Sequence, residues 1–367
     1  MAFRLLSALT LLSGLVSSTP LSLDKRLLSG VQSAGSPVSI DPAGVYIRAA
    51  TLNDGSLITG YAAQDGTQHV LRVARSTDGA QSWNDGWGEV WRADSATHEI
   101  DNAFPLVLPS GRVLYAFRNH DRTSAGVFTY YRITICYSDD GGQTFQFLVT
   151  VDERPANGVN GLWEPFMRLA RDGTLQVFYS SENSANDQDN LMKYSRDGGQ
   201  TWTGPITVSG GDTSSSRDGM TGVANIDGNG NLICVFENTE IGHFSIDRVL
   251  SHDDGYTWGE RARVYTAANS RDAGAPAVVN VGGTLVVSFM TNEDTPSVTV
   301  GQVDGSQMKL VTSVNGGQGW SNSGGGGFVA SDIGTHWPGL YAVNGNQFLA
   351  LYSKDGLGAV SQLFQLV

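Results

Sequence analysis

Five copies of an eight-residue motif recur along the chain at nearly even intervals, and this repeat limits the possible folds more than any other feature. Each copy has a serine, an aspartate or asparagine two residues later, one or two glycines, and an aromatic residue at its eighth position. The copies span residues 76–83, 138–145, 195–202, 251–258 and 313–320. Their starts lie between 56 and 62 residues apart. This period is typical of a four-stranded propeller blade and too long for a helical solenoid.

The octet has the composition of a hairpin turn. Its serine and its aspartate can accept hydrogen bonds from backbone amides, and its glycines tolerate a positive φ. The aromatic residue then begins the next strand and buries its ring. The motif therefore predicts architecture and says almost nothing about chemistry.

A second repeated unit, an apolar strand followed by a tight glycine turn and another apolar strand, precedes each octet. The turns are Asp54-Gly55, Ser110-Gly111, Asp172-Gly173, Asn229-Gly230, Gly282-Gly283 and Asn344-Gly345. Six hairpins with five octets leave the sixth blade incomplete, so we expect residues 36–40 to supply its missing strand and close the ring. The sequence predicts an all-β, six-bladed β-propeller of four-stranded antiparallel sheets.

The first residues have the form of a secretory signal, with Arg4 before an apolar run that ends in small residues. We expect a signal peptide over 1–19, a propeptide over 20–26 that ends in a dibasic pair, and a single catalytic domain over 27–367. The protein is thus expected to be secreted and extracellular, and to act as a monomer.

The net charge limits the classes of binding partner, and the cysteine positions indicate the state of the thiols. The net charge of −13 makes nucleic acids and anionic membranes poor partners, whereas a neutral substrate is easily accepted. Cys136 and Cys234 fall in the second and fourth blades, so we expect two separate buried thiols. No spacing of His, Cys or carboxylates resembles a metal site, and no cofactor is expected.

Polar residues at the start of each first strand and at the end of its partner are expected to share one mouth of the central channel. Glu164 lies between Trp163 and Pro165, and we expect the proline to hold Glu164 in an extended conformation. Glu237 ends an apolar run, where burial would place its charge beside a hydrophobic wall. Because their blades are neighbours, the two carboxyl groups are candidates for a glycosidase pair.

Further candidates at the same mouth would bind the substrate. They are Arg48, Asn102, Asn119, Trp163, Asp218, Asp272, His336, Trp337 and Tyr341. The aromatic ones could stack on sugar faces and the polar ones could hydrogen-bond hydroxyl groups. A strand-end glutamate in a propeller is nevertheless more often solvated or ion-paired than catalytic, and an aspartate there is often a turn cap.

The octets resemble the Asp-boxes of the sialidase-like (BNR-repeat) superfamily over the whole predicted mature chain. Within it, the stretches GLWEPFMRLARDGTLQVFYSSEN and LICVFENTE resemble the fungal exo-α-1,5-L-arabinanases of glycoside hydrolase family 93. The resemblance implies a retaining enzyme that releases arabinobiose from the non-reducing end of linear arabinan. It also implies Glu164 as the acid/base and Glu237 as the nucleophile, with Glu240 the next residue to test.

Two other classes of function stay open. A sialidase would need three arginines converging on a carboxylate, for which Arg48, Arg118, Arg217, Arg248 and Arg271 are available, plus a tyrosine nucleophile. A non-enzymatic carbohydrate-binding propeller would make the paired glutamates accidental. Hydrolysis of linear arabinan is the interpretation that the motifs favour.

Overall fold

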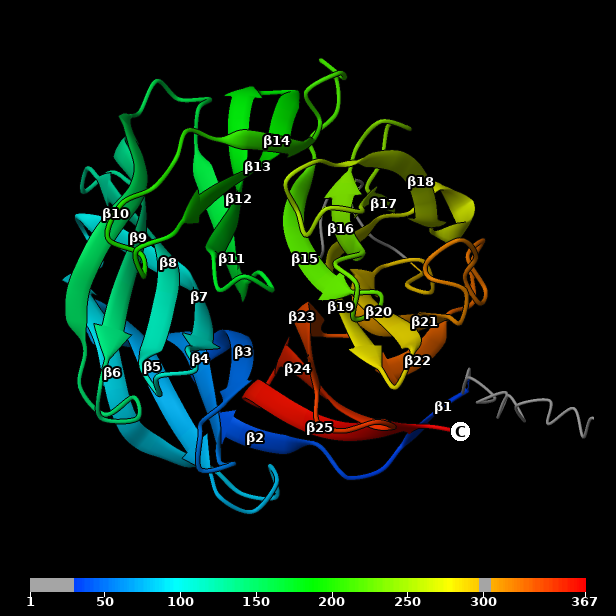
Figure 1. Cartoon of the computed structure of the whole chain (residues 1–367), viewed down its shortest axis with the longest axis horizontal. Helices are drawn as coiled ribbons and strands as arrows, with labels where there is room; N and C mark the ends of the chain where they lie inside the picture. Colours follow the sequence, from blue (N-terminus) through cyan, green and yellow to red (C-terminus); the bar gives the residue numbers. More distant parts are fainter. Residues whose placement is uncertain (1–29, 297–304) are drawn as a thin grey trace, which may run out of the picture.

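The computed structural model describes residues 30–296 and 305–367 and forms a ring of six β-sheets around a central axis (Figure 1). The expected signal peptide and propeptide lie outside the described residues. Each blade is antiparallel, and four consecutive strands build each of the first five blades. The prediction of a six-bladed propeller is confirmed. Within the described residues, no helix is long and apolar enough to cross a membrane.

The strands follow the blades in chain order, and within the described ranges one 3-10 turn, Ala268–Ser270, interrupts them. They are β3 (Val45–Thr51), β4 (Leu57–Asp65), β5 (Gln68–Ser76) and β6 (Asn84–Asp94) in blade 1; β7 (His98–Val107), β8 (Val113–Arg122), β9 (Phe128–Ser138) and β10 (Gln146–Pro155) in blade 2; β11 (Leu162–Leu169), β12 (Leu175–Ser184), β13 (Asp187–Ser195) and β14 (Ile206–Ser209) in blade 3; β15 (Gly219–Asn225), β16 (Leu232–Asn238), β17 (Ser245–Ser251) and β18 (Gly259–Tyr265) in blade 4; β19 (Ala273–Val281), β20 (Thr284–Thr291), β21 (Gln307–Ser313) and β22 (Phe328–Ser331) in blade 5; and β23 (Thr335–Ala342), β24 (Gln347–Lys354) and β25 (Gly358–Leu366) in blade 6.

Blade 6 is completed by the N-terminal part of the chain. Strand β2 (Val38–Asp41) pairs with β25, as the sequence predicted for residues 36–40. Strand β1 (Val31–Ser33) pairs with the far end of β25 and lengthens the same edge (Figure 1). The two ends of the chain therefore share one sheet, which closes the ring and covers an edge that would otherwise be open.

The octets act as turns that hold neighbouring blades together. In the third copy, Oδ1 of Asp197 accepts hydrogen bonds from the amides of Gln200 and Thr201 at 3.0 and 2.9 Å. The octet aromatics then pack toward the preceding blade: Trp202 lies against a core cluster with residues of blades 2 and 3, and Nε1 of Trp83 donates to Oγ of Ser361 in blade 6. The predicted hairpin turn is confirmed, whereas each octet aromatic is only partly buried and precedes the next strand instead of beginning it, because the turn continues through the aromatic residue.

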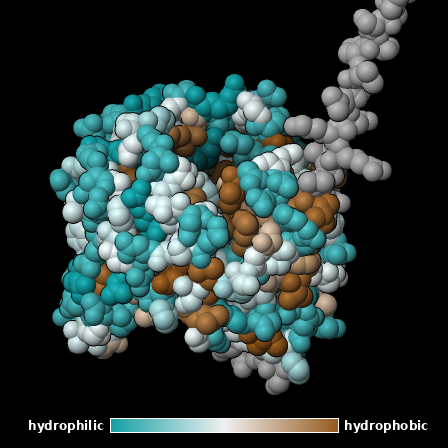
Figure 2. Space-filling model, turned by 90° about the horizontal axis from the view of Figure 1, so that it is seen from below, coloured by the Kyte–Doolittle hydropathy of each residue, from teal (hydrophilic) through white to brown (hydrophobic). Residues whose placement is uncertain are grey.

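The core is divided into clusters between the sheets rather than gathered at one centre. Cys136 and Cys234 are buried free thiols on β9 and β16, as predicted. On the face shown in Figure 2, hydrophilic residues predominate and hydrophobic ones form separate small groups.

Every innermost strand carries a β-bulge at the same place. In each blade the residue that opens the bulge has a left-handed backbone, with φ between 43° and 56°. These residues are Tyr46, Asn102, Glu164, Met220, Ala275 and Trp337, one in each of β3, β7, β11, β15, β19 and β23. Such a conformation is strained for a residue other than glycine, and bulges commonly redirect side chains near functional sites.

Candidate active site

A cavity of about 210 Å³ lies at the mouth where the first strands begin. It is lined by Glu164, Met220, Glu237, Phe244, Asp272, Gly274, Met290, Thr291, Asn292, Ser306 and Trp337. Blades 3, 4, 5 and 6 all contribute to this lining. The two glutamates singled out from the sequence therefore meet in one cavity, on neighbouring blades.

Apolar side chains close the floor of this cavity. Tyr46, Met220, Ala275 and Met290 form a buried cluster on the axis of the ring, and Trp337 packs against it. Met220, Met290 and Trp337 also line the cavity, so the cluster separates it from the rest of the central channel. A ligand that enters from the mouth meets a closed end.

Glu237 bridges blades 4 and 5. It lies on β16 opposite Gly219, and its Oε2 accepts a 2.7 Å hydrogen bond from the amide of Ala275 on β19. A Cβ atom on Gly274 would lie 2.7 Å from the same oxygen, so the glycine makes room for the carboxyl group. Burial raises the pKa of Glu237 to about 7; the Ala275 amide opposes this shift, and the charge of Glu164 adds to it.

Glu164 opens the bulge of β11, with a φ of 43°. The prediction that Pro165 holds it in an extended conformation is wrong, because the bulge that recurs in every inner strand imposes a left-handed backbone here. Burial raises the pKa of Glu164, while the positive charges of Arg118 and Arg217 lower it. Both glutamates are half-buried, but only Glu164 has two arginines among the groups that favour its ionised form.

The position of Glu237 has counterparts in other blades. In four blades, a side chain near the end of the second strand accepts a hydrogen bond from the bulge amide of the next blade. The acceptors are Ser353 for Tyr46, Ser180 for Met220, Met290 for Trp337, and Glu237 for Ala275. Only in blade 4 is this acceptor a carboxyl group, so an ionisable residue occupies a place that serine or methionine fills elsewhere.

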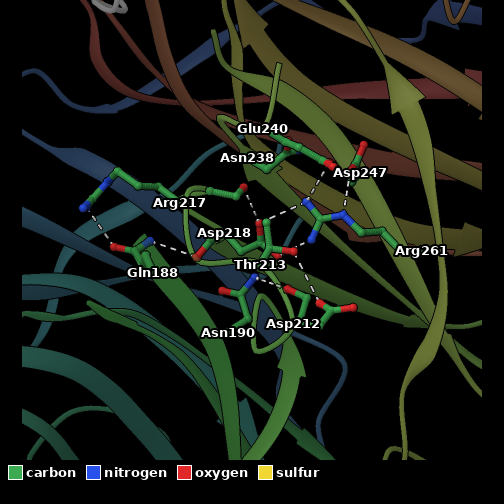
Figure 3. A network of polar contacts seen from close by, with 12 residues as sticks. Gln188, Asn190, Asp212, Thr213, Arg217, Asp218, Asn238, Glu240, Asp247 and Arg261 are labelled. Carbon is green, nitrogen blue, oxygen red and sulfur yellow. Dashed lines mark hydrogen bonds and ion pairs between the residues drawn. The ribbon is translucent and has the colours of Figure 1, made fainter. Parts of the chain in front are cut away.

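Arg217 is held in place beside the cavity. Its Nη2 lies 2.6 Å from Oε1 of Glu182. The same nitrogen lies 2.9 Å from Oε1 of Gln188 (Figure 3). Its charge lowers the pKa of both Glu164 and Glu237. The adjacent Asp218 is fully buried and forms an ion pair with Arg261 at 2.6 Å, so its carboxylate is directed into the protein (Figure 3).

Of the residues predicted to bind substrate, the structure brings Asp272 and Trp337 into the cavity with the two glutamates. Asp272 is buried and accepts a 3.0 Å hydrogen bond from the amide of Phe244. Asn102 is buried at the bulge of β7, on the same ring of positions as Glu164. Arg48 and Tyr341 line the channel on the other side of the apolar cluster.

The remaining predicted residues lie outside the lining of the glutamate cavity and of the channel beyond the apolar cluster. Trp163 packs among His120, Phe128 and Tyr131. His336 lines a hollow next to the cavity, which Trp337 also borders. Asn119 lines a surface hollow with residues of β6, β9 and β10, and the half-exposed Glu240 lies 3.7 Å from Arg261.

Sequence reasoning missed several residues of the cavity, namely Met220, Phe244, Gly274, Met290, Thr291, Asn292 and Ser306. A signal for the ring of bulges was present in the sequence. Glu164, Ala275 and Trp337 each precede a proline at the same place in their strands. An alignment of the six inner strands on these three residue–proline pairs would have marked the bulge position in every blade.

None of the arginines considered for a sialidase is part of the described lining of this cavity, and of the five only Arg118 and Arg217 influence the charge of its glutamates. Arg48 donates to backbone carbonyl groups of Ile47 and Trp337. Arg248 donates to Gly317 and Glu260 carbonyl groups, and Arg271 to the carbonyl of Thr295. In the described part of the chain, no group of three or more His, Cys, Asp or Glu residues is arranged to hold a metal ion.

In amino-acid sequence, part of the chain is similar to bacterial sialidases. No protein-family model matches the chain. A sialidase of Clostridium perfringens is 25% identical over 230 residues, which cover 56% of this chain and 58% of that protein. A sialidase of Paraclostridium sordellii is 25% identical over 176 residues, covering 42% and 44%. The matched region spans about half the length of these relatives.

Solved structures match over nearly the whole chain. The α-L-arabinanase of Penicillium chrysogenum, complexed with arabinobiose, has a TM-score of 0.65 at 21% identity and covers 93% of this chain and 98% of its own. The GH93 α-L-arabinofuranosidase of Fusarium graminearum, also with arabinobiose, has a TM-score of 0.63 at 18% identity, covering 93% and 98%. A leech intramolecular trans-sialidase has a TM-score of 0.59 at 14% identity, covering 93% and 70%.

The fold and these comparisons define a structural class. The chain is a six-bladed propeller that shares its fold with the solved GH93 arabinanase and arabinofuranosidase, and about half of its sequence is similar to bacterial sialidases.

Proposed function

We propose that the protein is a secreted, retaining exo-glycosidase that releases arabinobiose from the non-reducing end of linear α-1,5-L-arabinan. The observation that carries the proposal is the pairing of Glu164 and Glu237, from neighbouring blades, in one cavity that opens at the mouth and is closed at its inner end. A retaining glycosidase needs two carboxyl groups on either side of the scissile bond. The likeness to an arabinanase that binds arabinobiose supports the choice of substrate.

The closed floor supports action at chain ends. The cluster of Tyr46, Met220 and Met290 ends the cavity on the axis, so a polymer has no path through the ring from this mouth. A chain end with one or two sugars would fill the space, and the rest of the polymer would leave through the mouth. Trp337 and Asp272 then offer an apolar face and a hydrogen-bond acceptor to the bound sugars.

The electrostatics of the pair favours a division of roles opposite to the one that the family resemblance implies. Glu237, whose pKa burial raises to about 7, is protonated in about half of the molecules at pH 7 and in most of them at lower pH, and in that form it would donate its proton to the departing glycosidic oxygen. Glu164, beside the charges of Arg118 and Arg217, would attack the anomeric carbon as a carboxylate and form a glycosyl ester. Ionised Glu237 would then take a proton from water, which displaces Glu164.

The function is tested by incubating the purified protein with linear arabinan and, separately, with a sialyl reporter. Arabinobiose as the product, with the α-anomer formed first by NMR, supports the proposal. Free sialic acid would support the class suggested by the sequence matches instead, and no release from either substrate would favour a binding module. Detection of the protein in the medium of cells that express the full chain tests secretion.

The roles are tested with an aryl α-L-arabinobioside that carries a good leaving group, in the presence of azide. An acid/base variant still forms the glycosyl ester with such a substrate, and azide can replace the water that the missing base no longer activates. Glu237→Gln is expected to yield a glycosyl azide of retained configuration, while Glu164→Gln is expected to stay inactive. The opposite pattern would assign the roles as the family resemblance implies.

A further inference from the structure

The central channel contains a second cavity on the far side of the apolar cluster. Its volume is about 280 Å³, and all six innermost strands line it. The lining is formed largely by apolar side chains such as Ala50, Phe104, Phe166 and Val278. Exposed Thr51 and half-buried Tyr341 stand at its outer end, so the cavity reaches solvent at the mouth opposite the glutamates.

One positive charge lies in this apolar space. Arg48 is the one charged residue among the described lining, and it is only 8% exposed. The ring of Tyr46 covers its guanidinium at 4.1 Å. On the other side, Gly339 leaves it room, since a Cβ atom there would lie 2.9 Å from Nη1.

The protein provides hydrogen-bond acceptors for only one nitrogen of this guanidinium, Nη1. Its Nη1 donates to the carbonyl oxygens of Ile47 at 2.8 Å and Trp337 at 3.1 Å. Among the described residues, none forms an ion pair with Arg48, and none accepts a hydrogen bond from its Nε or Nη2. A buried charge without a counter-charge is costly, and a carboxylate matches the paired donors of a guanidinium edge.

We propose that this channel binds a small carboxylate with an apolar body, such as a short fatty acid or an aromatic acid. The carboxylate pairs with the Nε and Nη2 edge of Arg48, and the apolar body packs on Ala50, Phe166 and Val278. The ligand enters past Thr51 and Tyr341. This site is separate from the glutamate cavity and does not rest on the proposed glycosidase activity.

Sodium hexanoate is the probe, and hexan-1-ol is its neutral counterpart of the same chain length. Isothermal calorimetry is expected to give one hexanoate site per chain, and hexanoate is expected to raise Tm in a concentration-dependent way. Hexan-1-ol at the same concentrations is expected to bind at least about tenfold more weakly, because it lacks the charge-assisted hydrogen bonds. Equal binding of the two, or no hexanoate binding at all, would mean that water alone solvates Arg48 and would overturn the proposal.

Three variants locate the site. Arg48→Met keeps the length of the side chain without its charge and is expected to abolish the preference for hexanoate over hexan-1-ol, while Arg48→Lys is expected to keep part of it. Thr51→Trp places a large ring at the exposed outer end and is expected to block entry, with an unchanged circular dichroism spectrum as the check on folding. Glu237→Gln changes the other cavity and is expected to bind hexanoate like the wild type. Loss of binding in Glu237→Gln, or unchanged binding in Thr51→Trp, would place the anion elsewhere and contradict the proposal.

Discussion

Oε2 of Glu237 accepts a 2.7 Å hydrogen bond from the backbone amide of Ala275, the residue that opens the bulge of the next blade. This bond ties a carboxyl group of blade 4 to the strained backbone of blade 5. It fixes where one oxygen of Glu237 lies and leaves the other for the cavity. The geometry of the candidate pair therefore depends on the small residues around the bulge.

Gly274→Ala tests this dependence. Its Cβ would lie 2.7 Å from Oε2 of Glu237, and the carboxyl group has to move aside. A displacement of about 1 Å can reduce turnover about a hundredfold, so we expect a loss of this order in kcat with arabinan. Gly204→Ala is the matched control, because a Cβ there meets open space. Wild-type kcat in Gly274→Ala would show that the position of this oxygen does not matter for turnover.

The pKa of Glu237 predicts a pH dependence of stability. The folded pKa of about 7 lies above the ordinary value of 4.5, so between these values the folded protein keeps a proton that the unfolded chain releases. The free energy of unfolding then falls as pH rises through this window, by at most about 1.4 kcal/mol per pH unit from this group.

Urea unfolding of wild type and Glu237→Gln at pH 4.5 and pH 7 measures this contribution. Because glutamine does not titrate, the variant is expected to gain stability relative to wild type as the pH rises. A difference between the two proteins that is the same at both pH values would contradict the raised pKa.

Arg217 is expected to set the pH range of activity. Its charge lowers the pKa of both glutamates, so Arg217→Gln should move both limbs of the kcat/KM profile to higher pH. A merely structural role would lower Tm and leave the profile in place. The control is Arg196→Gln, whose side chain is exposed and stacks on Tyr194.

Substitutions in the octet turns are expected to lower the stability of the protein without changing its catalytic activity. Asp197 accepts hydrogen bonds from two amides and from the hydroxyls of Ser195 and Thr201, and these hold its pKa at about 2. Asp197→Ala is expected to lower Tm by a few degrees and to leave KM unchanged. Asp85→Ala is the comparison, because the carboxylate of Asp85 has no hydrogen bond to the described residues. Equal Tm values for the two variants would count against the turn as a support of the ring.

The ring could be predicted from the sequence because its signals are local. Each octet and each glycine turn specifies a hairpin within a few residues, and the spacing gives the number of blades. That Glu164 and Glu237 line one cavity could be predicted for a related reason. Their places near the start of β11 and near the end of β16 follow from the hairpin pattern, and the order of blades makes them neighbours.

The rest of the site depends on contacts between residues that are far apart in the chain. Asp218 is directed inward by Arg261, which follows 43 residues later, and Arg48 is held by the carbonyl of Trp337, 289 residues away. The left-handed backbone of Glu164 arises from a bulge that no single strand reveals. Such partners decide whether a strand-end residue faces the cavity, the channel or the interior.

The rate of hydrolysis of linear arabinan by wild type, Glu164→Gln and Glu237→Gln tests the central claim most directly. Each substitution keeps the shape of the side chain and removes one carboxyl group from the cavity. We expect arabinobiose release by the wild type, and a fall of at least a thousandfold, about 4 kcal/mol in the barrier, for each variant with an unchanged circular dichroism spectrum. A folded variant that hydrolyses arabinan at the wild-type rate would contradict the assignment of that glutamate to the catalytic pair.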